Sequence, residues 1–217
     1  SSALIDHYGE RVNRAGVEQM RRERRIPSLS DDLAYYYANA LQFFLEFSNA
    51  CNDWQRRTGQ MVIEYMASPD SAPWQKYIEI MNDTVAAWIA PQLEPIRAAD
   101  PMALVTIGWD WLLFAGLPAN RILDFQQFHL YGSRSLGGLR ALFSILDSLK
   151  RCFSDQPVMV GEFGYSNASS GNPTESQPVP QTLTALYEGA MFAYLRANGF
   201  TGGIKWMLND ASGVTNP

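Results

Sequence analysis

The sequence has few of the residues that bind metals or form disulfides. Its 217 residues include two cysteines, Cys51 and Cys152, and two histidines, His7 and His129. It contains no H-E-x-x-H motif and no closely spaced cysteine pair, so we expect no metal site. The two cysteines lie far apart in apolar, helical patterns. This favours two buried free thiols, while a disulfide and the cellular compartment stay open.

Several motifs that define function classes are also missing. No apolar run approaches the roughly 20 residues of a membrane-spanning helix, so no membrane span is expected. No strand is followed by G-x-x-x-x-G-K-[ST] or G-x-G-x-x-G, and there is no G-x-S-x-G elbow, so we expect neither a nucleotide cofactor nor a serine nucleophile. The net charge of −5 argues against nucleic acid as the main partner.

Aromatic residues, in contrast, are plentiful: 6 Trp, 10 Tyr and 11 Phe. We expect most of these rings to be core and three to five to line a cleft, because aromatic faces stack on sugar rings. The length suffices for one domain with a sizeable core, and no shift in composition marks a second one. We therefore expect a single domain over 1–217. The chain opens on two serines, and we expect it to be a piece of a longer protein.

Helical and strand patterns alternate along most of the chain. Apolar spacing predicts helices over 28–50, 73–98, 136–150 and 182–198, with Pro91 bending or breaking the second. Short apolar runs predict strands over 60–66, 104–109, 123–131, 157–163 and 202–208. This order predicts an α/β fold with a parallel sheet covered on both faces. Five strands fit an open doubly wound sheet or part of a barrel.

Polar and aromatic residues follow each predicted strand, at the edge where parallel α/β folds form their sites. They are Ser68, Trp109, Asp110, His129, Tyr131, Glu162, Trp206, Asn209 and Asp210.

The segment Pro157-Val-Met-Val-Gly-Glu-Phe-Gly164 resembles the seventh strand of retaining (β/α)₈-barrel glycoside hydrolases, in particular cellulase-like members. In that superfamily the glutamate, here Glu162, is the nucleophile. Phe128-His-Leu-Tyr131 is similar to the sixth strand, whose tyrosine hydrogen-bonds the nucleophile. Ile204-Lys-Trp206 is similar to the eighth, whose tryptophan floors the sugar subsite. The match covers roughly residues 60–210, which implies strands four to eight of an incomplete TIM barrel without its first strands. Residues 1–27 would then be a long connection after strand three.

This resemblance implies a retaining glycosidase acting on a β-linked oligo- or polysaccharide, without metal or cofactor. Glu162 and Tyr131 would be the catalytic pair. The sugar subsite would be shaped by His129, Trp109, Trp206, Asn209, Ser68 and Asp70.

The match departs from the family at strand four, which usually ends in Asn-Glu-Pro with the glutamate as acid/base. Here Ala67 and Ser68 precede Pro69, and a serine does not deliver a proton as a carboxylic acid does. Three explanations remain open. Asp70 or an acid outside this segment supplies the proton, the acid/base lies at another position, or the protein binds sugar without cleaving it. A chance likeness in an unrelated open-sheet protein is a further alternative.

Overall fold

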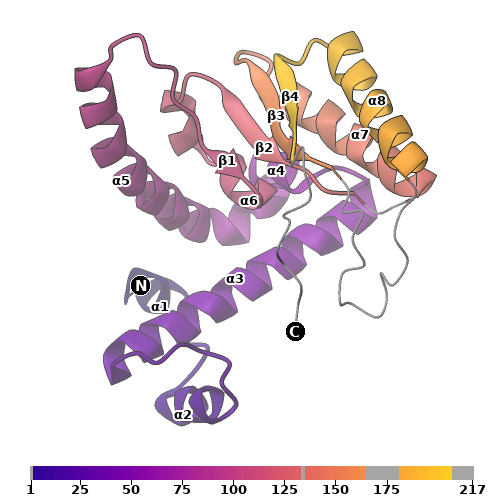
Figure 1. The fold of residues 1–217 in the computed structure, drawn as a ribbon. Helices are drawn as coiled ribbons and strands as arrows, with labels where there is room; N and C mark the ends of the chain where they lie inside the picture. Colours follow the sequence, from indigo (N-terminus) through magenta and orange to yellow (C-terminus); the bar gives the residue numbers. More distant parts are fainter. Residues whose placement is uncertain (1, 133–134, 165–180, 207–217) are drawn as a thin grey trace, which may run out of the picture. The chain divides into compact units, whose positions relative to one another are not determined.

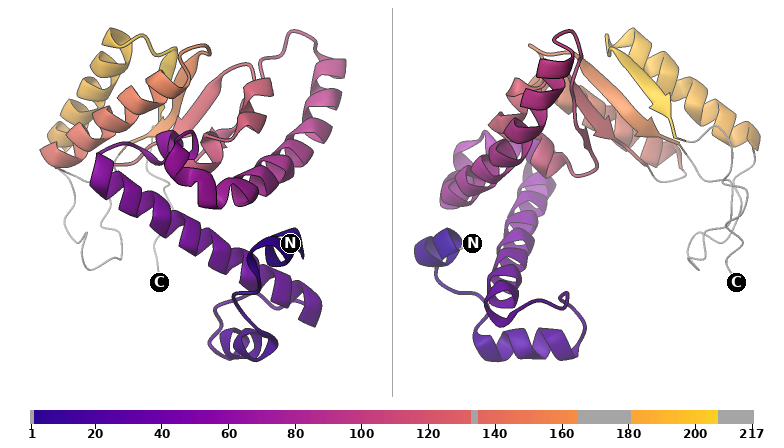
Figure 2. Two further views of the ribbon diagram at one scale, coloured as in Figure 1. Left: turned by 180° about the vertical axis from the view of Figure 1, so that it is seen from behind. Right: turned by 60° about the vertical axis from the view of Figure 1, so that its left-hand side comes forward.

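The computed structural model describes residues 2–132, 135–164 and 181–206 (Figures 1 and 2). The chain divides into two compact units, residues 1–92 and 93–217. Composition gave no sign of this division. Each unit is described by itself.

The described part of the first unit is helical throughout (Figure 1). Ser30 begins the longest helix, with Asp31 and Asp32 in its first turn, and Gly59 ends it in the left-handed conformation. Helix α5 continues through Pro91 without breaking. The elements are α1 (Ser2–Tyr8), α2 (Arg14–Arg22), α3 (Asp31–Thr58), α4 (Val62–Met66), the 3₁₀ helix η1 (Pro69–Trp74) and α5 (Gln75–Ala99), which ends in the second unit.

An aromatic core holds these helices together. The ring of Phe47, on α3, lies 5.0 Å from that of Tyr77, 5.5 Å from Trp74 and 6.0 Å from Tyr65. The region expected to be a long connection, 1–27, forms α1 and α2. This region is held to α3 by Asn39, a buried residue of that helix. The Asn39 side chain accepts from the Val12 amide and donates to the Val12 carbonyl.

The strand predicted over 60–66 is wrong, since these residues contain α4. The Glu64 carboxylate accepts from the Met61 amide at 2.8 Å, which satisfies a backbone donor at the start of the helix. Ile63 and Tyr65 are buried. A short apolar run of this kind does not separate a buried strand from a buried turn of helix.

The second unit contains the predicted parallel sheet, with four strands in the order β1-β2-β3-β4. Between β2 and β3 the chain passes through α7, and α8 precedes β4; both helices lie on one face of the sheet (Figure 2). Phe128 contacts Phe153 at the end of α7, and Phe163 contacts Phe192 of α8. The elements are β1 (Gly108–Trp109), α6 (Leu112–Ala115), the 3₁₀ helix η2 (Pro118–Ile122), β2 (Gln126–His129), α7 (Leu136–Cys152), β3 (Val158–Phe163), α8 (Gln181–Ala197) and β4 (Gly202–Lys205).

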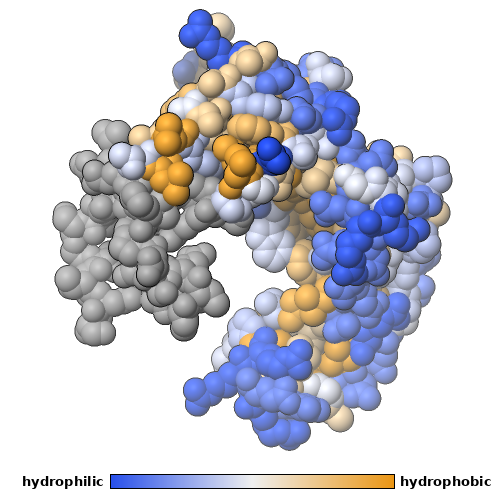
Figure 3. Space-filling view, turned by 90° about the vertical axis from the view of Figure 1, so that its right-hand side faces the viewer, coloured by the Kyte–Doolittle hydropathy of each residue, from blue (hydrophilic) through white to orange (hydrophobic). Residues whose placement is uncertain are grey.

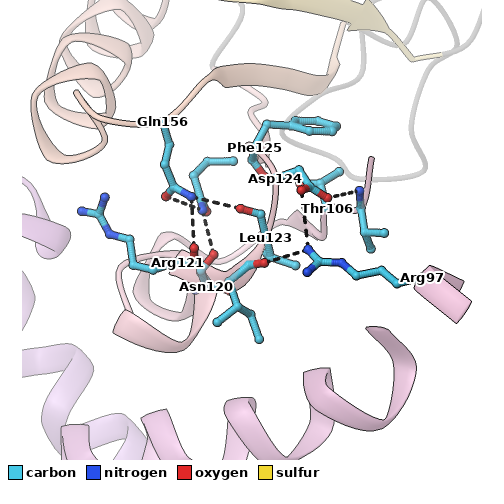
Figure 4. A network of polar contacts seen from close by, with 11 residues as sticks. Arg97, Thr106, Asn120, Arg121, Leu123, Asp124, Phe125 and Gln156 are labelled. Carbon is cyan, nitrogen blue, oxygen red and sulfur yellow. Dashed lines mark hydrogen bonds and ion pairs between the residues drawn. The ribbon is translucent and has the colours of Figure 1, made fainter. Parts of the chain in front are cut away.

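The strand predicted over 104–109 is shorter than expected, and the segment before it is held by side-chain hydrogen bonds together with one backbone bond, from the Asp124 amide to the Val105 carbonyl (Figure 4). Asp124 accepts from the Val105 amide at 2.7 Å, and Thr106 donates its hydroxyl proton to the Phe125 carbonyl at 2.7 Å. Gln156 donates to the Leu123 carbonyl. These contacts fix the segments that lead into β1 and β2 without regular pairing.

Within the described sheet, the edge strands β1 and β4 each pair on one side only. Apolar residues gather on the surface near β4 and α8, where Figure 3 shows them exposed. They include Leu183, Leu186, Phe192 and Ile204.

Neither Cys51 nor Cys152 forms a disulfide, and the prediction that both are buried holds only for Cys51. Burial raises the pKa of the Cys51 thiol to about 12, so it stays protonated at neutral pH. No helix among the described residues has the length and apolar character needed to span a membrane.

Candidate active site

Polar side chains of the second unit meet at the carboxyl ends of its parallel strands. His129 closes β2 and is in register with Glu162 of β3. The Leu130 amide donates to the Glu162 carbonyl at 2.8 Å, which extends this alignment past the end of β2. His129, Tyr131 and Glu162 therefore lie at the same edge of the sheet.

A β-bulge decides which way Glu162 faces. Phe128 pairs with Val160, but the next residue, His129, pairs with Glu162, so Gly161 is the extra residue in β3. If β3 kept Gly161 but paired regularly, alternation would place Glu162 on the face of Val160, which is buried. The bulge instead puts Glu162 on the same face as His129. A Cβ on Gly161 would lie 2.0 Å from the side-chain Nε2 of Gln127, so a larger residue here would require the Gln127 side chain to move.

Tyr131 orients the Glu162 carboxylate. Its hydroxyl donates to Glu162 Oε2 at 2.7 Å. Partial burial raises the pKa of the Tyr131 phenol, and the hydrogen bond to Glu162 raises it further, so the phenol stays a donor well above neutral pH. The carboxylate itself is partly covered, with 21% of its side chain exposed. Glu162 is thus held in one orientation while remaining reachable.

His129 turns a single ring nitrogen toward two carboxylates. Its Nδ1 lies 2.9 Å from Asp110 Oδ1 and 3.6 Å from Glu162 Oε2. On the other side of the ring, Nε2 lies 3.5 Å from the Gln127 amide nitrogen. Nδ1 is therefore within hydrogen-bond distance of the Asp110 carboxylate. Gly108 makes space for the ring, because a Cβ there would lie 2.1 Å from His129 Nε2.

Trp109 belongs to an aromatic stack at the end of β1. Its indole donates to the buried Asn120 side chain at 3.1 Å. Its ring lies 5.8 Å from that of Phe114, and Trp111 lies 6.2 Å from Phe114, both nearly parallel. Trp109 is therefore fixed by its own fold, while Trp111 presents an exposed ring beside it.

Trp206 follows β4 at the same edge. Its amide donates to the Phe163 carbonyl at 2.9 Å, next to Glu162 in sequence, and 53% of the residue is exposed. Gly164 allows this approach, since a Cβ there would lie 2.9 Å from the Trp206 carbonyl oxygen. Asn209 and Asp210 lie outside the described residues.

Ser68 and Asp70 belong to the first unit, and both are used by its local structure. The Ser68 hydroxyl donates to the Tyr65 carbonyl at 2.8 Å, and Ser68 begins η1. Asp70 Oδ2 accepts from the Trp54 indole at 2.8 Å. Their roles in a sugar subsite stay predictions.

Sequence reasoning placed Asp110 at a strand end but gave it no role in the site, and it missed Trp111 and Gln127. Trp111 directly follows Asp110, so position after a strand could have found it. Gln127 had a weaker signal, its two-residue spacing from His129, which places both on one face of β2. Among the described residues, no group of three or more His, Cys, Asp or Glu side chains could hold a metal ion.

No protein-family model matches the sequence, and no curated protein matches it. Two solved structures show partial similarity. One is a β-glucuronidase of Bacteroides uniformis, with 16% identity and a TM-score of 0.43 over 61% of this chain and 15% of that one. The other is B. uniformis β-glucuronidase 2 covalently bound to cyclophellitol-6-carboxylate aziridine, with the same identity and TM-score over 70% and 17%. The chain thus spans about a sixth of the length of these proteins.

Proposed function

We propose that this protein is a glycoside hydrolase that cleaves a β-linked oligo- or polysaccharide by a retaining mechanism, with Glu162 as the nucleophile. One observation carries this proposal. Glu162 sits at the carboxyl edge of a parallel sheet, and the Tyr131 hydroxyl donates to its Oε2 at 2.7 Å. A carboxylate that attacks an anomeric carbon must be ionised and aimed, and a hydrogen bond from a neutral phenol supports both.

The remaining edge residues are proposed to hold the sugar. His129 lies 3.6 Å from the nucleophile, close enough to contact a hydroxyl of the sugar being cleaved. Trp206 follows β4 with half of its surface exposed, which suits an aromatic floor for that subsite. Trp109 and Asn209 complete the proposed subsite, and Ser68 and Asp70 are assigned to it by sequence alone.

We further propose that residues 1–217 belong to one (β/α)₈-barrel domain of cellulase-like type, in which β1 to β4 are strands five to eight. The open edges of β1 and β4 support this, because a barrel leaves no strand edge unpaired. The exposed apolar residues near β4 are those that neighbouring elements of a barrel would cover. The helical α4 stands where strand four was expected.

The test uses 2,4-dinitrophenyl β-glycosides of glucose, galactose, mannose, xylose and glucuronic acid, because their leaving group needs no proton. Stopped-flow absorbance follows release of dinitrophenolate by the protein that carries these 217 residues. We expect turnover on at least one sugar. Glu162→Ala should abolish it, by at least about 10³-fold, because removal of the nucleophile removes the covalent route.

The matched control is Glu94→Ala, at an exposed position on α5. It should react like the wild type. A 2-deoxy-2-fluoro glycoside of the same sugar should label the peptide containing Glu162, as detected by mass spectrometry. Equal rates in wild type and Glu162→Ala, or label on another carboxylate, would contradict the assignment.

A second function is a sugar-binding protein that does not cleave. It is favoured by the state of Ser68, since the residue in the acid/base position is a serine whose hydroxyl is bonded to the Tyr65 carbonyl. Calorimetry with oligosaccharides separates the two. Binding that persists in Glu162→Gln, with no turnover of any aryl glycoside by the wild type, supports the binding protein.

A further inference from the structure

We propose that Asp110 is the acid/base residue of this site; the inference rests on the retaining mechanism proposed above. That mechanism needs a second carboxyl group about 5 Å from the nucleophile, on the other side of the scissile bond. The positions that sequence suggested, Ser68 and Asp70, are bonded to the Tyr65 carbonyl and the Trp54 indole within the first unit. Asp110 lies in the second unit, with Glu162.

The distances to His129 set an upper limit on the separation of the two carboxylates. His129 Nδ1 lies 2.9 Å from Asp110 Oδ1 and 3.6 Å from Glu162 Oε2, so these two oxygens are at most about 6.5 Å apart. This limit includes the roughly 5–5.5 Å of retaining enzymes and stops where the range of inverting enzymes begins, at about 6.5 Å. The charge of Asp110 also reaches Tyr131, where it adds to the effects of burial and Glu162 in raising the phenol pKa.

The solvent exposure of each carboxylate suits its proposed role: the nucleophile is the more covered and the acid/base the more open. Glu162 is 21% exposed and fixed by Tyr131, whereas Asp110 is 70% exposed and fixed on one side by His129. An acid/base must reach both a departing sugar oxygen and an incoming water, so it needs an open approach. The nucleophile needs one orientation. His129 bonds to Asp110 and borders Glu162, which sets the spacing between them.

Aromatic rings border Asp110 on both sides in sequence. Trp109 and Trp111 both stack on Phe114, so the loop that carries Asp110 is held by a layer of rings. Trp111, whose ring is exposed, directly follows the proposed proton donor in sequence. A sugar on the leaving-group side would stack there, because pyranose C–H groups pack on aromatic faces. The substrate class is therefore a glycan with a further sugar on the leaving side.

The chemistry balances with these two residues. In the first step a Glu162 carboxylate oxygen bonds to the anomeric carbon, and the glycosidic C–O bond breaks. Its electron pair stays on the leaving oxygen, which takes the proton of the Asp110 carboxyl group. In the second step a water oxygen attacks the anomeric carbon, and the Asp110 carboxylate takes a proton from that water. The ester bond breaks and its electron pair returns to Glu162.

The test compares Asp110→Asn with the wild type on two substrates of the same sugar. For an alkyl glycoside, a poor leaving group, kcat/KM should fall by about 10²–10⁴-fold, the usual contribution of a general acid. For the dinitrophenyl glycoside kcat/KM should change little, while kcat falls and a burst appears because water attacks the glycosyl-enzyme slowly. Sodium azide should restore kcat and yield the β-glycosyl azide, since azide needs no general base.

The matched control is Asp155→Asn, at a surface carboxylate paired with Arg121 in the same unit; it should behave as the wild type. Asp110→Asn that equals this control would overturn the inference while leaving Glu162 as nucleophile. Loss without azide rescue would also overturn it, because Asp110 would then act only by positioning His129. If the wild type itself shows no turnover on dinitrophenyl glycosides, the retaining mechanism fails first, and that result is independent of Asp110.

Discussion

The two units use the same kinds of polar residue in opposite ways. In the first, Asp70 and Ser68 complete the hydrogen bonding of an aromatic, helical core, through the Trp54 indole and the Tyr65 carbonyl. In the second, Asp110 and Glu162 lie at the edge of a parallel sheet and share His129. Asp70 thus satisfies a donor of the core, whereas Asp110 and Glu162 border one imidazole at the edge of a sheet.

This difference shows how to separate stability from chemistry in one chain. A buried donor such as the Trp54 indole needs its acceptor, so Asp70 is explained by folding alone. The Asp110 carboxylate is mostly exposed and has no comparable structural need. Substitutions in the first unit should therefore lower stability, and substitutions around Glu162 should lower activity.

Among substitutions that leave both carboxylates in place, the largest effect is expected from Gly108→Ala. The new methyl group would overlap His129 Nε2, at 2.1 Å, and push the ring away from Asp110 and Glu162. A displacement of about 1 Å can cost about 10²-fold, so we expect kcat/KM to fall by that order. Gly189→Ala, in an open position on α8, is the control and should keep full activity. Steady-state kinetics on a dinitrophenyl glycoside decide the matter, and equal values for both variants would refute this role for Gly108.

A middle effect is expected from Asp70→Ala, which leaves the buried Trp54 indole without its acceptor. The cost should be about 1–3 kcal/mol of unfolding free energy, measured by urea denaturation. Asp83→Ala, exposed on α5, should cost less than about 0.5 kcal/mol. If Asp70→Ala instead abolishes turnover at full stability, Asp70 is a catalytic acid and the contrast between the units disappears.

The smallest effect concerns Tyr194, whose hydroxyl donates to Asp147 and whose ring stacks on Phe143 at 3.9 Å. Burial raises the pKa of this phenol to about 12, and its bond to Asp147 adds to the rise. A proton held more tightly in the folded state stabilises it fully below pH 10, and this stabilisation is lost as pH rises from 10 to about 12.

Tyr194→Phe should therefore cost about 1 kcal/mol near neutral pH, and its deficit should shrink between pH 10 and 12. Tyr37→Phe, at an exposed site on α3, is the control. Thermal unfolding followed by circular dichroism across this range gives both values. A deficit that stays constant with pH would show that the Asp147 contact does not stabilise the protonated phenol.

Much of the second unit could be predicted from its sequence. The apolar run at 158–163 and the helical spacing of 136–152 are strong because each pattern is long and consistent with its neighbours. The run at 60–66 gave the wrong structure, since the contact between Glu64 and the Met61 amide is invisible in an apolar pattern. The irregular path at 104–107 depends on Asp124, about twenty residues away, so no local signal reveals it.

The candidate site was also predictable only in part, because some of its contacts depend on residues far apart in the sequence. Tyr131 and Glu162 follow from the likeness of their strands to a known family, and the structure places them in contact. The pairing of Asp110 with His129 depends on the turn after β1 and on the space above Gly108. Such tertiary details have no signature in residue spacing.

The bulge at Gly161 decides which side chains of β3 face the candidate site. In β3, this one extra residue stands between Val160, which faces the core, and Glu162, which lies at the candidate site. If the same residues paired regularly, without the bulge, Glu162 would share the face of Val160 and turn its carboxylate into the apolar interior, where an unpaired charge is strongly unfavourable. The pairing register at this point of the chain is therefore as constrained as residue identity.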